Sequence, residues 1–130
     1  MEPTRLAAIP LFATLSPADL ERLAAVAGEL EVAEGTPLTE EGDFGHALFA
    51  IESGTADVAT DGTVIRSVGP GEVVGEVAVL ASGRRTATVV ATTPMRLIVL
   101  FKRDVWKLER DAPDMAERLR ELLAVHLENA

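Results

Sequence analysis

Hydrophobic positions along the chain change their spacing twice. Residues 1–28 carry apolar side chains at helical intervals, residues 29–101 carry short apolar or alternating runs separated by glycine, and residues 102–130 return to helical intervals. Helical intervals are typical of helices that bury one face, and short alternating runs are typical of strands. We therefore predict one domain over residues 1–130, with helices at both ends of a β-rich middle region.

The first region predicts a helical turn followed by a longer helix. Residues 4–12 are short, apolar and broken by Pro10. Ser16 is a favourable N-cap and Pro17 suits the first helical position, so we expect the longer helix to start there. We expect this helix to end at Gly28, in a left-handed conformation.

The middle region predicts many short strands. Turn-forming residues punctuate it, and the Asp61-Gly62 pair between two apolar runs is a good hairpin signature. Many short strands at this spacing indicate a sandwich or a roll. We expect the strands at residues 30–33, 37–40, 47–52, 55–60, 64–67, 85–91 and 95–101.

Two helices are predicted after the strands. A short helix at residues 104–110 carries Trp106, which we expect to anchor the core. Asp111 is placed to cap a final helix that has Pro113 in its first turn. One apolar stripe of this final helix is formed by Met115, Leu119, Leu122, Leu123 and His126.

Composition narrows the function. The chain has 130 residues and a net charge of −9, and no run of lysine and arginine interrupts that acidity, so we expect no binding of nucleic acid or of membranes by this chain. It has no cysteine, which excludes disulfides, thiolate chemistry and zinc held by cysteine, and which fits a cytoplasmic protein. The N-terminal residues do not form a signal-peptide pattern, and no apolar run reaches the ~18–20 residues of a membrane span.

Residues 71–88 contain the candidate binding chemistry. Gly75 permits close approach of the backbone to a ligand, and a helical turn that begins at Glu76 would offer free N–H groups to an anion. Arg85 follows a glycine-containing loop and is expected to open a strand, where its guanidinium would bind two anionic oxygens. A carboxylate and a guanidinium in one pocket suit a ligand that carries both hydroxyl and phosphate groups.

Two motifs in this segment carry a resemblance to a known family. Gly75-Glu76-Val77-Ala78-Val79-Leu80 and Arg85-Thr86-Ala87 resemble, in order and spacing, the phosphate-binding cassette of the cyclic-nucleotide-binding domain family. That family includes regulatory subunits of protein kinase A, cyclic-nucleotide-gated channels and the bacterial catabolite activator protein. The similarity extends over residues 6–127, and Val74 and Arg84 depart from the family pattern, which usually has phenylalanine and an uncharged residue there.

The resemblance implies a fold, a ligand and a set of site residues. The fold is mainly β with flanking helices: an eight-stranded antiparallel β-roll (a double-stranded β-helix of jelly-roll type) at 29–101, N-terminal helices at 1–28, and hinge and lid helices at 102–130. By the resemblance, Arg85 binds the cyclic phosphate of cAMP or cGMP, and Glu76 binds the ribose 2′-hydroxyl. The implied ligand-binding residues are Gly75, Glu76, Val77, Ala78, Arg85, Thr86 and Ala87, and the implied lid residues are Leu119, Leu122, Leu123 and His126. Neither a metal nor a cofactor besides the nucleotide is implied.

Other interpretations of these residues stay open. Arg85 is also typical of a surface arginine with a local carboxylate partner, and Glu76 of an acid that favours the first turn of a helix. The apolar stripe of the final helix is also typical of a packing face. His46 is expected in a loop.

The leading hypothesis is a regulatory sensor that couples binding of a cyclic nucleotide to movement of its C-terminal helices. The alternative is a non-binding relative that serves as a dimerisation or docking module. We expect no enzyme, because the two histidines, His46 and His126, are far apart in sequence and no Ser/His/Asp set can be assembled. A DNA-binding regulator would need a helix-turn-helix segment after the last helix. Besides the nucleotide, the expected partners are a second copy of the chain or a larger effector protein that contains this domain.

Overall fold

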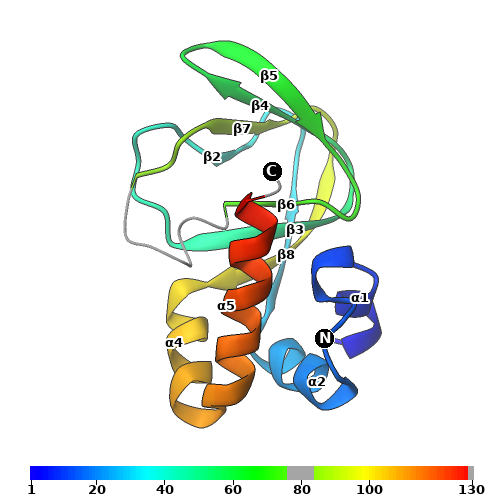
Figure 1. The fold of residues 1–130 in the computed structure, drawn as a ribbon. Coiled ribbons are helices and arrows are strands. Elements are labelled where there is room, and N and C mark those ends of the chain that lie inside the picture. Colours follow the sequence, from blue (N-terminus) through cyan, green and yellow to red (C-terminus); the bar gives the residue numbers. More distant parts are fainter. Residues whose placement is uncertain (76–83, 129–130) are drawn as a thin grey trace.

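Two antiparallel sheets form the body of the molecule. The computed structural model describes residues 1–75 and 84–128, with side chains described as far as Val125. The strands are β1 Gly28–Val32, β2 Pro37–Thr39, β3 Ala47–Ser53, β4 Ala56–Thr60, β5 Thr63–Val68, β6 Val73–Val74, β7 Thr88–Ala91 and β8 Met95–Phe101. One four-stranded sheet has the order β1-β8-β3-β6, and the other has the order β2-β7-β4-β5 (Figure 1). The prediction of a mainly β, antiparallel roll is confirmed.

Strands β3 and β8 are buried on both faces. Alternate residues of β3 point to opposite sides of the sheet, so that Leu48 and Ala50 pack in the cluster beneath the helices, whereas Ile51 packs in the cluster between the two sheets. β8 divides in the same way, with Leu100 on the helix side and Leu97 between the sheets. This double burial explains why both strands are nearly continuous apolar runs in the sequence.

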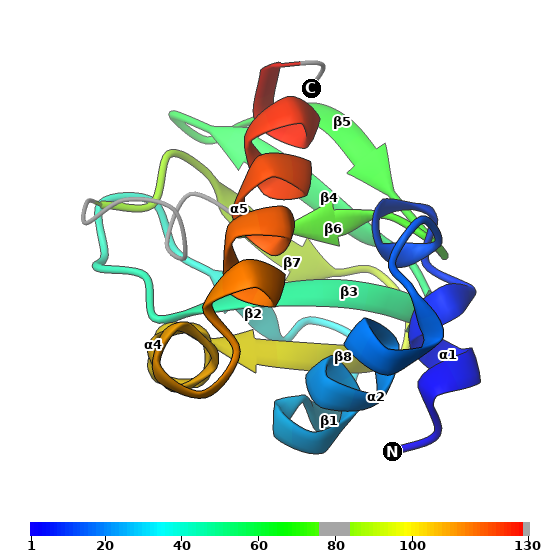
Figure 2. The same ribbon diagram turned by 60° about the horizontal axis from the view of Figure 1, so that its bottom comes forward.

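Helices from both ends of the chain pack on the outer face of the first sheet (Figures 1 and 2). They are α1 Pro3–Ala7, η1 Pro10–Phe12, α2 Pro17–Val26, α4 Lys102–Asp111 and α5 Pro113–Glu128. Large buried side chains from both groups meet in one cluster, which includes Phe12, Leu23, Met115, Leu119 and Leu123. Within the described residues, no helix combines the length and the apolar character needed to cross a bilayer.

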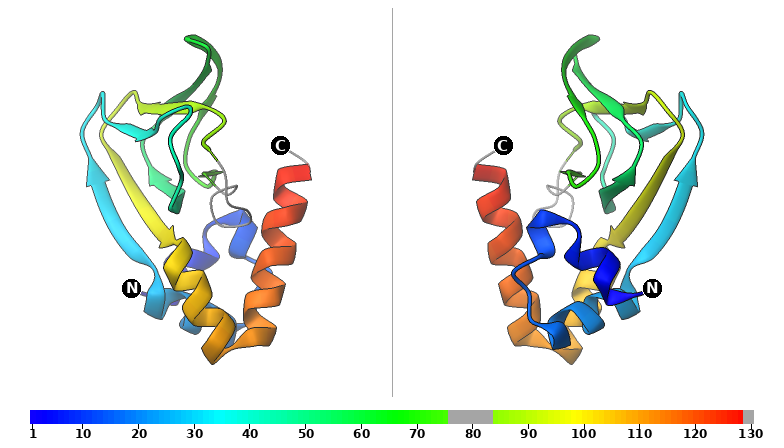
Figure 3. Two further views of the ribbon diagram at one scale, coloured as in Figure 1. Left: turned by 90° about the vertical axis from the view of Figure 1, so that its left-hand side faces the viewer. Right: turned by 90° about the vertical axis from the view of Figure 1, so that its right-hand side faces the viewer.

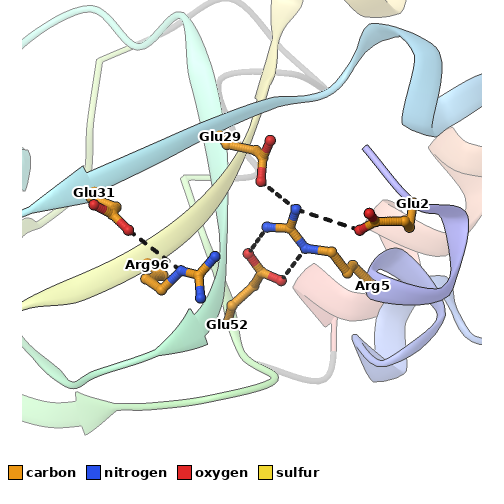
Figure 4. A network of polar contacts seen from close by, with 6 residues as sticks. All are labelled: Glu2, Arg5, Glu29, Glu31, Glu52 and Arg96. Carbon is orange, nitrogen blue, oxygen red and sulfur yellow. Dashed lines mark hydrogen bonds and ion pairs between the residues drawn. The ribbon is translucent and has the colours of Figure 1, made fainter.

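An arginine network fastens α1 to the first sheet (Figure 4). Arg5 on α1 donates hydrogen bonds of 2.9 and 2.5 Å to the two carboxylate oxygens of Glu52 on β3, and it also pairs with Glu29 on β1. These hydrogen bonds hold the pKa of Glu52 below its usual value. Beside them, Arg96 on β8 lies 3.6 Å from Glu31 on β1. Charged groups therefore join the N-terminal helix to strands that are distant from it in sequence.

Three predictions about the helices are wrong. Asp111 does not cap the final helix, because it is the last residue of α4 and α5 begins at Pro113. α2 ends at Val26, and Gly28 begins β1 without a positive φ angle, because the chain passes from the helix into the strand through an extended residue. Trp106 is 56% exposed and does not anchor the core. The buried positions of α4 are filled by Val105 and Leu108, which lie one turn apart on a face that Trp106 does not share.

The predicted strands differ from the observed ones at two points. The pattern of the sequence does not predict β6, because two apolar residues between turn-forming residues are too few to show an alternation. β7 begins at Thr88 and not at Arg85, because the chain bends at Thr86 and Ala87 before it joins the sheet. Arg85 therefore lies in the approach to a strand.

Candidate functional site

Arg85 is held in place by backbone groups from other segments. Its Nη2 donates to the carbonyl oxygen of Ala47 on β3 at 2.7 Å, and its Nη1 donates to the carbonyl oxygen of Gly75 at 3.0 Å. Its backbone N–H donates to the carbonyl of Asp43 at 2.6 Å, and its own carbonyl accepts from the N–H of Gly42 at 3.0 Å. Main-chain atoms of other segments thus position both the backbone and the guanidinium of Arg85.

Gly75 makes room for the Arg85 guanidinium. Its φ angle is +81°, which an L side chain rarely adopts. A Cβ atom at this position would lie 2.5 Å from Nη1 of Arg85 and 2.9 Å from the carbonyl oxygen of Ala47. Glycine is therefore required here by the backbone angle and by the close approach of the arginine.

A cavity of about 340 Å³ opens beside Arg85. This volume lies at the lower end of the range of small-molecule sites. β2, the start of β3 and the segment between them supply most of the wall, which is lined by Pro37, Leu38, Thr39, Glu40, Asp43, Phe44, His46, Ala47, Phe49 and Arg85. The wall thus combines apolar side chains with one guanidinium, one imidazole and the two acidic residues Glu40 and Asp43. A ligand with an apolar part, an anionic group near Arg85 and hydroxyl groups near the acids would match this lining.

Side-chain hydroxyls attach the segment after Arg85 to β2. Thr39 is buried, and its Oγ1 donates to the carbonyl oxygen of Ala87 at 2.9 Å. Thr88 accepts a hydrogen bond from the backbone N–H of Glu41 at 3.0 Å. These bonds hold the chain that carries the arginine against the wall of the cavity.

The structure places only part of the predicted ligand-binding set. Gly75 and Arg85 are in contact, Thr86 is exposed, and Ala87 is half-buried. The predicted positions Glu76, Val77 and Ala78 lie outside the described residues. His46, expected in a loop, is in the segment that leads into β3 and lines the cavity. Sequence reasoning missed the carbonyl oxygens that hold Arg85, because every residue type carries one.

Arg84, one of the two predicted departures from the family pattern, lies at the edge of the cavity. Its Nη1 donates to the carbonyl oxygen of Gly42 at 2.6 Å, and its guanidinium lies 4.6 Å from the centre of the Phe44 ring. Phe44 is 64% exposed and lines the cavity. Arg84 and Phe44 therefore form a cation–π pair at the rim.

The predicted lid residues lie away from the cavity in this arrangement. Leu119 and Leu123 have no exposed surface and pack in the cluster shared by the helices and the first sheet. Leu122 is half-buried and lines a separate groove of about 770 Å³ between α5 and the N-terminal helices. The side chain of His126 lies outside the described residues. Figure 3 shows α5 beside the roll, and no described residue of α5 lines the cavity next to Arg85.

A buried ion pair connects α5 to α2. The side chain of Asp19 is only 3% exposed, and its two oxygens accept hydrogen bonds from Arg118 at 2.8 and 2.9 Å. Arg22 lies 3.6 Å from the same carboxylate. The hydrogen bonds from Arg118 hold the pKa of Asp19 below its usual value, against the opposing effect of burial. This pair fixes α5 against the N-terminal helices.

Among the described residues, no three histidines or acids lie close enough together to hold a metal ion.

Comparison with known proteins defines the class of this roll and cavity. The family model for the cyclic nucleotide-binding domain matches residues 29–111, which include the strands, Arg85 and α4. The N-terminal domain of a transcriptional regulator from Streptomyces coelicolor is 31% identical and superposes with a TM-score of 0.80, over 99% of this chain and 92% of that one. The chain belongs to the cyclic nucleotide-binding domain family.

Individual relatives are longer proteins of different activities. The "Cyclic AMP receptor protein" of Thermus thermophilus is 32% identical over 93% of this chain and 58% of that protein. A "Cyclic nucleotide-gated potassium channel" of Mesorhizobium japonicum is 34% identical over 88% of this chain and 32% of that protein. The "Acetyltransferase Pat" of Mycolicibacterium smegmatis is 35% identical over 88% of this chain and 35% of that enzyme. The chain thus spans from about a third to under three fifths of the length of these relatives, whose names describe different activities.

Proposed function

We propose that this domain binds a cyclic mononucleotide, cAMP in preference to cGMP, and acts as a regulatory sensor without catalysis. The observation that carries the proposal is Arg85, held by the carbonyl groups of Ala47 and Gly75 in the wall of a cavity. The name of the Thermus thermophilus relative supports cAMP as the ligand. A guanidinium fixed in advance loses little entropy when it binds a phosphate.

Each site residue has a defined role in this proposal. Arg85 neutralises the cyclic phosphate, and Glu76 accepts a hydrogen bond from the ribose 2′-hydroxyl. Backbone N–H groups at Ala78 and Thr86 complete the phosphate site, and the Thr86 hydroxyl is compatible with both adenine and guanine. Gly75, Val77 and Ala87 form the remaining wall.

We further propose that binding is coupled to α5. Leu122 reaches the base only if α5 shifts towards the cavity, and Leu119 and Leu123 follow only if they leave the core cluster. His126 is the fourth lid residue of this proposal. The ligand shifts this equilibrium to the extent that it binds the closed arrangement more tightly. The domain would work in the cytoplasm, as a homodimer or as part of a larger effector protein.

Calorimetric titration with cAMP and with cGMP tests the proposal. We expect saturable binding of cAMP by the wild type and binding weakened about tenfold or more by Arg85→Ala, because each charge-assisted hydrogen bond contributes ~1.5–3 kcal/mol. Arg66→Ala is the matched control, since Arg66 is exposed on β5 and does not line the cavity. Circular dichroism checks that each variant is folded. Unchanged affinity in Arg85→Ala removes the proposed mechanism, and absence of binding by the wild type favours the non-binding docking module.

A further inference from the structure

The solvent-facing side of α4 differs from the rest of this acidic chain. Arg103, Trp106, Lys107 and Arg110 follow one another at intervals of three, one and three residues and are all exposed, so they share one face of the helix. We refer to these four residues as the α4 basic face. Val105 and Leu108 fill the buried side of the helix. In Figure 2, α4 lies at the edge of the molecule, seen end-on, with β8 and α5 to one side of it.

The cations of the α4 basic face have no acidic partner among the described residues. Most other arginines are paired, since each of Arg5, Arg22, Arg96, Arg118 and Arg120 lies within 4.0 Å of a carboxylate. Two of the three acids of α4 are used elsewhere: Asp104 accepts from the backbone N–H of Phe101 at 3.0 Å, and Glu109 pairs with Arg120 on α5. The third, Asp111, is exposed at the end of the helix. The Arg103 guanidinium lies 4.7 Å from the centre of the Phe101 ring, and it has no carboxylate within 4.0 Å among the described residues. The chain has 21 acidic residues against 12 lysines and arginines, so unpaired cations gathered on one face are unexpected by chance.

Trp106 adds a large apolar surface to these charges. Its indole is 56% exposed, and Nζ of Lys102 lies 5.6 Å from the centre of the ring. Tryptophan and arginine are the residues that most often dominate the binding energy of protein interfaces. In the free domain this indole remains in contact with water. A partner that covers it removes apolar area from water, which favours binding.

We propose that the α4 basic face binds an acidic segment of a partner protein. Carboxylates of the segment lie against Arg103, Lys107 and Arg110, and an apolar side chain of the segment covers Trp106. The charges are complementary, and steering by unlike charge accelerates such encounters. The partner then sits on the helix that joins β8 to α5, at the junction between the roll and the final helix.

The net charge of the chain favours a protein segment over an anionic membrane. That charge is −9 although α4 carries this basic face, so the rest of the chain holds the acidic excess. A bilayer is broad enough to meet this excess as well as the basic face, and like charges repel. A narrow peptide touches the cations alone.

Titration of tryptophan fluorescence tests this proposal, because Trp106 is the single tryptophan of the chain. The probe is a short synthetic peptide of glutamates around a central pair of leucines. We expect a saturable change in emission, an affinity that falls as salt is added, and an affinity weakened roughly tenfold by Lys107→Glu. Arg66→Glu is the matched control, since it makes the same charge change at an exposed position of β5, and we expect it to leave the affinity unchanged.

Three outcomes overturn the proposal: no saturable change in the wild type, equal weakening by Lys107→Glu and Arg66→Glu, or binding to phosphatidylserine vesicles without binding to the peptide. The experiment is independent of the nucleotide. We expect Lys107→Glu to bind cAMP as the wild type does, so a failure of the nucleotide hypothesis and a failure at α4 are told apart.

Discussion

At position 75, a hydrogen atom in place of a side chain leaves room for the guanidinium of Arg85. Two costs would arise from any other residue there: the φ angle of +81° and the approach of a Cβ atom to within 2.5 Å of Nη1. Only the second cost concerns the site. Gly35 has a similar φ angle of +87°, and a Cβ atom there would meet nothing within 4 Å, so the two positions separate backbone strain from displacement of the arginine.

At the residue scale we predict that Gly75→Ala weakens nucleotide binding and Gly35→Ala does not. Gly35→Ala should lower the free energy of unfolding by roughly 1–2 kcal/mol, because it forces an L residue into the left-handed region. Gly75→Ala should lower it further, because its Cβ atom would also lie 2.9 Å from the carbonyl oxygen of Ala47. Only Gly75→Ala displaces Arg85, and its affinity for cAMP should fall by about tenfold or more. Urea denaturation and calorimetry measure the two effects. Equal affinities of the two variants for cAMP would contradict the role assigned to Gly75.

The elements of this fold differ in how far their sequences predict them. β3 and β8 are predictable because each is an apolar run between turn residues, and the start of α2 is predictable because Ser16 accepts a hydrogen bond from the N–H of Asp19 at 3.1 Å, as its capping pattern requires. β6 is not, since it is defined by its pairing with β3 and not by a pattern of its own. Trp106 shows that residue type alone does not predict burial, because the buried residues of α4 are those on the face that meets the rest of the molecule.

The candidate site was predictable to a similar extent. Residue type and spacing single out Arg85 and Gly75, since a fork of donors and a residue without a side chain are both specific properties. They predict Gly75 against a ligand, whereas the structure places it against the guanidinium of Arg85. The position of the Arg85 guanidinium, in contrast, depends on carbonyl oxygens that β3 and the segment after β6 bring together. It is therefore a property of the fold. The ion pair between Asp19 and Arg118 is another such property, since its partners are 99 residues apart.

At the element scale we predict that Asp19→Asn loosens α5 and lowers stability by roughly 1.5–3 kcal/mol, the usual contribution of a hydrogen bond to a charged group. Because the pKa of Asp19 is lower in the folded state, the stabilisation is present above the unfolded pKa of about 3.9 and is lost as the pH falls through the folded pKa. The difference between wild type and variant should therefore be constant near neutral pH and shrink in acid. Thermal unfolding from neutral to acidic pH measures it.

Glu21→Gln is the control for this experiment. Glu21 is an exposed carboxylate on the same helix, and it forms no ion pair among the described residues, so its removal should change stability little at any pH. A pH dependence that is the same for Glu21→Gln and Asp19→Asn would show that the buried pair is not its source.

As a whole, the molecule resembles a detachable regulatory module. Its relatives join the same domain to a channel or to an acetyltransferase, and this chain spans 32% and 35% of those proteins. Three features bear on such use: a cavity with a fixed guanidinium, a final helix held by the Asp19–Arg118 pair, and the basic face of α4, the helix that joins β8 to α5. The first receives the proposed signal, and the other two lie where a response can be transmitted.

At the scale of the whole molecule we predict that cAMP raises the unfolding temperature. At 100 times its dissociation constant, a ligand that binds only the folded state adds ~2.7 kcal/mol, which corresponds to a rise on the order of 10 °C for a domain of this size. cAMP at that same concentration should shift Arg85→Ala far less. A shift of equal size in both proteins would mean that the nucleotide binds elsewhere.

Because main-chain oxygens hold Arg85, main-chain atoms and side chains have separate roles in the cavity wall. In the proposed binding site, the position of the anion-binding guanidinium depends on the path of the backbone at Ala47 and Gly75, whereas the apolar lining comes from side chains such as Leu38 and Phe49. Substitutions in the lining can therefore retune the preference for one base or another while the charge-binding part is left intact. Such a receptor can acquire new ligands by drift in its lining, provided that each new ligand still presents an anion to the same arginine.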